Sequence, residues 1–224
     1  LSNPKYRNTI ITILASILSG GIGFVLGEFN FNTKSNKIRN ESVLEKNKST
    51  QKNQLQSQYF NQGIEKFNDK EYQSAIIEFN KAIDLNPNNF KYLEARAQAN
   101  LLSNNLKGSL SDYTKAIKIN SKSINSYLNR GMVKSQLNDK KGAIDDYKMA
   151  IEINPKNPLP FNLLGVEYIG MNDYKSAILN FKNVIALDPK SSFAADAYNN
   201  LCWIKYKSNN LDDAINDCNK GIKI

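Results

Sequence analysis

The sequence predicts an all-α fold made of five stacked helix pairs, and three observations support this prediction. A thirteen-residue block at 75–87 recurs with the same apolar pattern at 143–155 and at 177–189. The prolines that close the second and third copies lie 34 residues apart, and the first copy begins twice that distance before the second. A period of this length is typical of solenoids, in which one helix pair cannot bury its apolar face without a neighbour.

Each unit has small residues at positions 8, 20 and 27, and the first four units have one bulky residue at position 24. The units are 56–89, 90–123, 124–157, 158–191 and 195–224, with three extra residues before the last. Position 8 holds Gly63, Ala97, Gly131, Gly165 and Cys202, and position 24 holds Phe79, Tyr113, Tyr147, Phe181 and Cys218. Small side chains let two helices approach closely, and the bulky side chain fills the remaining gap.

The turns and helix ends also follow the period. Asn104, Asn138, Asn172 and Asn209 all fall at position 15, where we expect the turn between the two helices. Asparagine tolerates the left-handed conformation that ends a helix, so these residues are interpreted as turn residues and not as binding groups. Prolines at position 32 stop the second helix, although Ser121 replaces one of them.

Both cysteines of the chain lie in the last unit, at positions 8 and 24. Cys202 is larger, and Cys218 smaller, than the residues at the same positions in the other units. This compensation predicts that the two side chains touch across the helix pair. Two packed thiols are the preferred interpretation, and a disulfide is the alternative in an oxidising compartment.

The chain before residue 56 has a different composition. After a tail at 1–7, residues 8–27 carry no charge, and twenty helical residues span roughly 30 Å, the thickness of a bilayer core. The sequence predicts a single-pass transmembrane helix here, with a cleaved signal peptide or a helix buried in protein as alternatives. Lys5 and Arg7 favour, weakly, a cytoplasmic amino end and exported repeats.

Residues 28–55 are rich in Asn, Lys, Ser and Gln and predict a flexible basic linker, with helix after Ser49 as an option. At the other end, the chain stops inside the fifth unit without a polar capping helix. We therefore expect further chain beyond Ile224, and also before Leu1.

The 34-residue period with this order of small and bulky residues resembles the tetratricopeptide repeat family. The resemblance implies helix–turn–helix units that stack into a solenoid with a concave face. It also implies that a protein or peptide partner binds this face, mainly through the first helix of each unit. The implied partner-binding residues are Asn61, Ile64, Gln98, Asn129, Met132, Asn162, Val166, Asn199, Asn200 and Trp203.

Two binding modes of the family can be compared with these residues. A clamp for the carboxyl-terminal tail of a chaperone needs cations in the units flanking Asn129, but Glu94 and Leu159 are among the residues found there. An acidic and an apolar group cannot hold two carboxylates, so the clamp is rejected. Asparagine at position 6 of units one, three and five instead suits an amide ladder that binds a peptide backbone, with chance as the alternative. Trp203 is either an interface anchor or a packing residue.

The composition argues against an enzyme. The chain has no histidine, and two cysteines alone cannot build a zinc or iron–sulfur site. No glycine-rich phosphate loop is present, and the paired acids Asp145-Asp146 and Asp212-Asp213 are interpreted as favourable charges near helix starts. We expect no catalytic residue, metal or cofactor.

The predicted function is a membrane-tethered scaffold for protein–protein interaction. One alternative is an anchoring or regulatory subunit of an enzyme or of an assembly or translocation complex. The other alternative is contact with anionic lipid or nucleic acid. It rests on the net charge of +9, a large share of which lies before residue 56.

Overall fold

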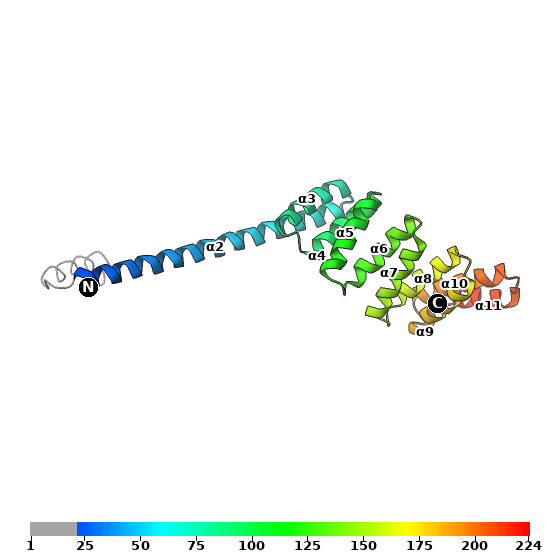
Figure 1. The fold of residues 1–224 in the computed structure, drawn as a ribbon. Helices are drawn as coiled ribbons and strands as arrows, with labels where there is room; N and C mark the ends of the chain where they lie inside the picture. The colour runs from blue at the N-terminus through cyan, green and yellow to red at the C-terminus, as the bar shows by residue number, and fades with distance from the viewer. Residues whose placement is uncertain (1–21) are drawn as a thin grey trace. The chain divides into compact units, whose positions relative to one another are not determined.

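The computed structural model describes residues 22–224, and the side chains from Lys37 onward. Every regular element in this part of the chain is an α-helix (Figure 1). The helices are α2 (Ile22–Asn68), α3 (Tyr72–Leu85), α4 (Phe90–Leu102), α5 (Leu106–Ile119), α6 (Ile124–Gln136), α7 (Lys140–Ile153), α8 (Pro158–Gly170), α9 (Tyr174–Leu187), α10 (Ser192–Lys207) and α11 (Leu211–Ile222). The chain divides into two compact units, Leu1–Gln54 and Leu55–Ile224, with the boundary inside α2.

The second unit is a stack of helix pairs in sequence order. Helices α4 and α5, α6 and α7, α8 and α9, and α10 and α11 pack as pairs, and each pair also contacts the next. The first pair consists of the last turns of α2 together with α3, and the rings of Phe60 and Phe79 lie 5.7 Å apart within it. Phe60 also contacts Tyr92 of α4, with ring centroids 4.7 Å apart. The predicted all-α solenoid of repeated hairpins is therefore confirmed.

The predicted match between small and bulky residues forms the centre of each pair. Phe79, Tyr113, Tyr147 and Phe181 are at most 1% exposed. A methyl group added at Gly131 would lie 2.5 Å from the Tyr147 ring, and one at Gly165 would lie 2.6 Å from the Phe181 ring. Glycine leaves room for the ring, which lies directly against the backbone of the first helix.

The turns have the conformation that the asparagines predict. Lys70, Asn104, Asn138, Asn172 and Asn209 have φ between 57° and 64°, which is the left-handed region. The second helix of an internal unit then starts with a side-chain cap, as where the Asp139 carboxylate accepts a hydrogen bond from the backbone N–H of Gly142. Such a cap satisfies one of the backbone donors that a helix start leaves free.

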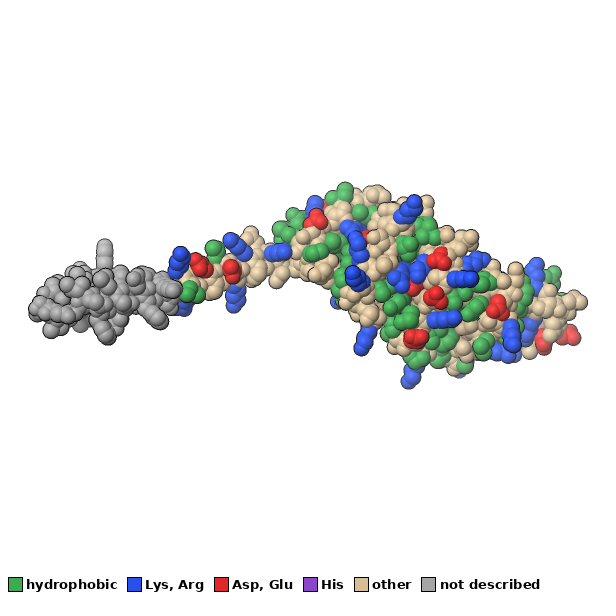
Figure 2. Space-filling model, in the orientation of Figure 1, with side chains coloured by type: hydrophobic (Ala, Val, Ile, Leu, Met, Phe, Trp, Pro, Cys, Tyr) green, Lys and Arg blue, Asp and Glu red, His purple; other side chains and the backbone are tan. Residues whose placement is uncertain are grey.

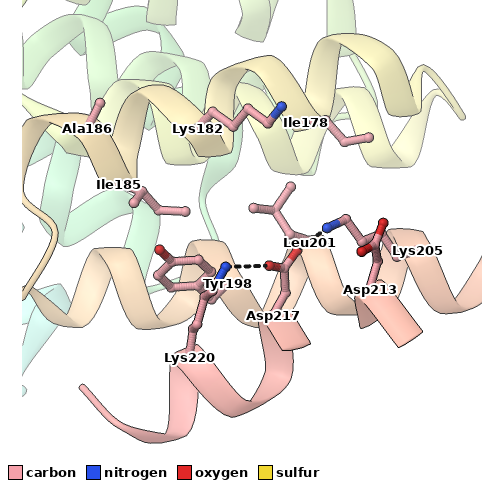
Figure 3. A pocket seen from close by; sticks show the side chains of 10 residues that line it. All are labelled: Ile178, Lys182, Ile185, Ala186, Tyr198, Leu201, Lys205, Asp213, Asp217 and Lys220. Carbon is pink, nitrogen blue, oxygen red and sulfur yellow. Dashed lines mark ion pairs between the residues drawn. The ribbon is translucent and has the colours of Figure 1, made fainter. Parts of the chain in front are cut away.

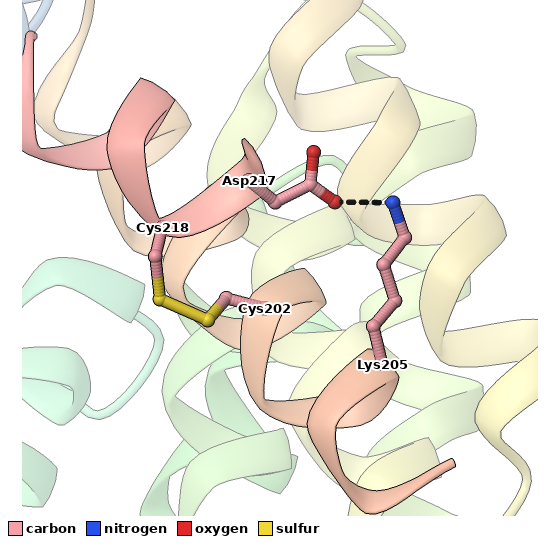
Figure 4. Close-up of a disulfide and its surroundings, with 4 residues drawn as sticks. All are labelled: Cys202, Lys205, Asp217 and Cys218. Carbon is pink, nitrogen blue, oxygen red and sulfur yellow. Dashed lines mark ion pairs between the residues drawn. A yellow bond between two sulfur atoms is a disulfide. The ribbon is translucent and has the colours of Figure 1, made fainter. Parts of the chain in front are cut away.

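The last helix pair differs from the prediction in one respect. Cys202 and Cys218 touch across α10 and α11, as expected, but they form a disulfide rather than two packed thiols (Figure 4). Their Cα atoms are 5.3 Å apart, which is within the range that a disulfide spans. Neither cysteine is as large as the aromatic residue at position 24 elsewhere, so a covalent bond joins the two helices where the other units have a ring.

The segment at 28–55 also differs from the prediction of a linker without regular structure, because α2 runs through all of it. Its side chains from residue 37 to residue 55 are exposed, so no tertiary packing holds this part of the helix. The segment contains no proline or glycine, and its Lys, Glu, Gln and Leu residues are good helix formers. Low apolar content alone was therefore not sufficient to predict an irregular backbone.

The predicted transmembrane segment lies mostly outside the described residues. Positions 8–21 are not described, and 22–27 form the start of α2. Within residues 22–224, no helix combines the length and the apolar character needed to cross a bilayer.

Candidate protein-interaction surface

The first helix of each unit presents the predicted partner-binding residues at the surface. The end of α2 carries Asn61 and Ile64, α4 carries Gln98, α6 carries Asn129 and Met132, α8 carries Asn162 and Val166, and α10 carries Asn199, Asn200 and Trp203. All ten side chains are exposed or half-buried. Residues at positions 4, 7, 8 and 11 of the same helices turn toward the neighbouring helices, because a helix repeats every 3.6 residues. The predicted residues therefore occupy one accessible face, which we call the first-helix face.

An apolar row runs along the first-helix face at position 9. Met132 is 37% exposed, Val166 is 47% exposed and Trp203 is 41% exposed. Of the helices that carry them, α8 contacts α10 directly, and α6 is linked to α8 through α7, which contacts both. Accessible apolar side chains in such a row are suited to bury apolar groups of a partner.

The asparagines of this face are more varied. Asn61 is exposed, whereas Asn129 and Asn200 are half-buried, and Ala95 and Leu163 interrupt their row at position 6. Asn162 lies one position earlier, and its side-chain oxygen is buried without a hydrogen-bond partner. The amide ladder therefore remains a prediction for three of the five units.

Trp203 packs against neighbouring side chains and also remains accessible at the surface. Its ring meets the ring of Tyr174 from the preceding unit edge to face, with centroids 6.1 Å apart. The ammonium of Lys207 lies 5.6 Å from the centre of the indole ring. These contacts hold the orientation of the ring, while about two fifths of the side chain is left exposed. A fixed, accessible tryptophan is suited to anchor a partner.

The residues that replace the clamp cations have structural partners. The carboxylate of Glu94 accepts hydrogen bonds from the hydroxyl groups of Ser123 and Ser126, at the start of α6. Leu159 and Leu163 pack against the apolar cluster of the third unit. Glu94 therefore joins two successive units, and the leucines provide no positive charge for a carboxylate.

Ion pairs that the sequence pattern did not lead us to expect join positions 7 and 23. The Arg96 guanidinium donates to both carboxylate oxygens of Asp112 at 2.8 and 2.6 Å, and also to Asn80 at 2.7 Å. Arg130 contacts Asp146 in the same way, at 2.9 and 2.6 Å. The signal was present, because each Arg–Asp pair has the same separation of 16 residues and the two pairs lie one period apart.

These ion pairs also correct the interpretation of Asp146. It lies in the second turn of α7 and pairs with Arg130 and with Lys134, whose ammonium is 2.9 Å away. It is therefore a buried partner of two cations, not a charge that offsets the helix dipole. For Asp212 and Asp213 the prediction is confirmed, since both lie in the first turn of α11.

Two tyrosines of the core are titratable groups with a shifted pKa. Burial raises the pKa of Tyr113 and of Tyr147, and nearby carboxylates raise it further. In the part of the chain that the structure describes, no three carboxylate, cysteine or histidine side chains are grouped as metal ligands. Figure 2 shows basic and acidic side chains intermixed over the visible face of the repeats, without a continuous patch of one sign.

Family comparisons agree with the repeat. Two family models, both described as tetratricopeptide repeat, match this chain: one at residues 124–157 and the other at 58–89 and 161–191. No curated protein sequence matches the chain.

Many solved structures have the same fold, although their sequences differ widely from this chain. MamA 41-end from Desulfovibrio magneticus RS-1 has a TM-score of 0.69 at 15% identity, covering 75% of this chain and 94% of its own. YrrB, described as a TPR protein with an unusual peptide-binding site, has a TM-score of 0.61 at 19% identity, covering 74% and 84%. The first TPR of Spaghetti (RPAP3), bound to the HSP90 peptide SRMEEVD, has a TM-score of 0.52 at 24% identity, covering 53% and 94%. At these identities the three likenesses establish a shared fold.

Proposed function

We propose that this chain is a protein-interaction scaffold that binds a protein or peptide on the first-helix face, because family models of the tetratricopeptide repeat match three of its units. The observation that carries the proposal is the exposed apolar row of Met132, Val166 and Trp203 on three successive first helices. The row lies beside amide side chains that both donate and accept hydrogen bonds, which suits an extended peptide. The proposed role is binding, and any chemistry belongs to the partner.

Two structural relatives support this function through their peptide ligands. YrrB has a peptide-binding site, and the Spaghetti domain is bound to an acidic HSP90 peptide. The ligand proposed for this chain differs from the second one, because Glu94 and Leu159 occupy positions where a carboxylate clamp needs cations. A peptide with apolar side chains and an accessible backbone fits the first-helix face better than an acidic tail.

We also propose that residues 8–27 tether the scaffold to a membrane, with the tail at 1–7 on one side and the repeats on the other. The support is the uncharged run of twenty residues, which is long enough for the bilayer core. We favour, weakly, the exported side for the repeats. Extraction with alkaline carbonate tests the tether, because an anchored chain stays with the membrane pellet and a peripheral chain is released. Protease access to the repeats in sealed vesicles then reports the side.

The interaction surface is tested by capturing partners with the full chain in three forms: the parent chain, Val166→Asp and Leu179→Asp. Val166→Asp places a charge within the apolar row, and Leu179→Asp is the matched control, because Leu179 is 61% exposed on the second helix α9. Loss of a central apolar anchor typically costs about 2 kcal/mol, which is roughly thirtyfold in affinity. We expect the first variant to lose the partner and the control to keep it. Equal recovery by both variants would contradict the proposal.

A further inference from the structure

The grooves between successive second helices are filled differently along the repeats. In the first groove, Arg96 of α4 reaches Asn80 of α3 and Asp112 of α5. In the second groove, Arg130 of α6 donates to Thr114 of α5 at 3.5 Å and to Asp146 of α7. Both side chains extend from position 7 and close the space between the two second helices.

The third and fourth grooves have leucine at position 7, but only the third has an aromatic residue at position 11. Tyr168 of α8 packs against the apolar clusters on both sides of its groove. In the fourth groove, position 7 is Leu201 and position 11 is Lys205, whose ammonium pairs with Asp217 of α11 at 2.6 Å. No arginine or tyrosine side chain therefore fills the groove from these two positions.

The fourth groove is an open pocket of about 600 Å³ between α9, α10 and α11 (Figure 3). Ligand pockets commonly have volumes of about 300–1,000 Å³, and they combine apolar walls with a few polar groups. Ile178, Ile185 and Leu201 provide apolar surface here. The other residues that line it are Lys182, Ala186, Tyr198, Lys205, Asp213, Asp217 and Lys220.

The charged residues of the pocket include one lysine and one aspartate without an ion-pair partner among the described residues. Asp217 pairs with Lys205 and, at 3.7 Å, with Lys220. Asp213 accepts a hydrogen bond from the Asn210 side chain at 2.8 Å. Three lysines and two aspartates give the lining a net charge of +1, and among the described residues Lys182 has no ion-pair partner.

We propose that this pocket binds a carboxylate carried on an apolar stem. The carboxylate pairs with Lys182 on the α9 side of the pocket, and the stem packs on Ile178 and Ile185. The site is separate from the first-helix face. On α10, Leu201 and Lys205 lie on the side of the helix opposite to Trp203, because these residues are two positions away from it in each direction.

Two probes distinguish the source of the carboxylate. The free acid is 4-phenylbutyrate, and the peptide probe is N-acetyl-Leu-Glu-amide, whose acidic side chain follows an apolar one. The readout is the NMR shift of the isoleucine methyl groups in the full chain. Ile178 and Ile185 report on the pocket, and Ile144 and Ile151 are matched controls because they hold the same positions one unit earlier.

We expect at least one probe to shift the pocket methyl groups saturably while the control methyl groups stay in place. Lys182→Ala is expected to weaken binding about tenfold, and 4-phenylbutyramide to bind about tenfold more weakly than the acid, since both changes remove the charge pair. Lys148→Ala is the matched control one unit earlier and should have no effect. Leu201→Arg copies the first two grooves and should abolish binding.

The relative affinity of the two probes also identifies the source of the carboxylate. Tighter binding of the dipeptide supports a partner protein as the source, and tighter binding of the free acid supports a small carboxylic acid. The proposal is overturned if neither probe gives a saturable shift, if the amide binds as well as the acid, or if Lys182→Ala binds as the parent chain does.

Discussion

Replacing Gly165 by alanine tests the packing rule on which the stacked repeats depend. The new methyl group would lie 2.6 Å from two atoms of the Phe181 ring and 3.0 Å from a third. Favourable carbon–carbon contacts lie at roughly 3.5–4.0 Å, so either the ring or the helix must move by about 1 Å. Phe181 is completely buried, and close-packed protein cores leave little space into which a ring can withdraw.

The expected change in the free energy of unfolding of Gly165→Ala is the sum of two opposing effects. Overpacking of a core costs about 1–3 kcal/mol, and alanine gains up to about 1 kcal/mol over glycine inside a helix. In the second unit, Ala97 is buried against Tyr113, so the fold can accept one methyl group at this position. The overpacking cost of Gly165→Ala should therefore lie below the upper end of this range. We expect a net loss of about 1–2 kcal/mol in the free energy of unfolding, equivalent to a melting temperature lower by roughly 2–8 °C.

The assay is denaturant unfolding of the full chain followed by helical circular dichroism, with a double-mutant cycle. In a Phe181→Leu background, Gly165→Ala should cost much less or become stabilising, because the side chain that it strikes is smaller. Gly170→Ala is the control, since the nearest neighbour of its methyl group is the flexible tip of Lys140. A Gly165→Ala variant as stable as the parent chain would refute the packing argument.

Three further predictions concern the turns, the buried ion pairs and the core tyrosines. Lys70→Asn should stabilise the chain by about 0.5–1 kcal/mol in thermal unfolding, because lysine is unfavourable at its φ of 63°, and no gain would contradict this. Asp146→Ala should lower the free energy of unfolding by about 3–5 kcal/mol, because it leaves the Arg130 guanidinium without its carboxylate. Denaturant unfolding measures this loss. A comparable loss in Asp145→Ala, which changes the exposed neighbour, would contradict the role of the ion pair. Burial raises the pKa of Tyr113 and Tyr147, so the folded chain keeps protons that the unfolded chain releases above a pH of about 10. The free energy of unfolding should be unaffected by these groups below that pH and fall above it, less steeply in Tyr147→Phe; an equal slope in both chains would contradict this.

The architecture was predictable because its physical cause recurs in the sequence. A small residue at position 8 opposite an aromatic one at position 24 appears in four units, and the structure places each pair in direct contact or in one core. The turn at position 15 was equally predictable, except in the first unit, where Lys70 adopts the conformation of the asparagines. Here the local sequence gives no signal, and the surrounding helix pair imposes the turn.

Features that depend on long side chains or on chemical state were harder to predict. The ion pair between Arg96 and Asp112 depends on the direction in which two long side chains extend from neighbouring helices. The pattern of small and bulky residues does not contain this information. The bond between Cys202 and Cys218 depends on oxidation, which proximity permits but does not require. The helix at 28–55 forms through the intrinsic helix propensity of its residues, without a packed core. The low apolar content of the segment therefore did not predict it.

The central claim is that the first-helix face is the surface on which the scaffold binds its protein partner. The most direct measurement is photo-crosslinking in cells from one of two matched sites, Met132 on α6 or Met149 on α7. Both side chains are 37% exposed, so accessibility does not distinguish them. Crosslinks to one protein from a benzoylphenylalanine at 132, and none to it from 149, are the predicted result. The same adducts from both sites, or from 149 alone, would contradict the account.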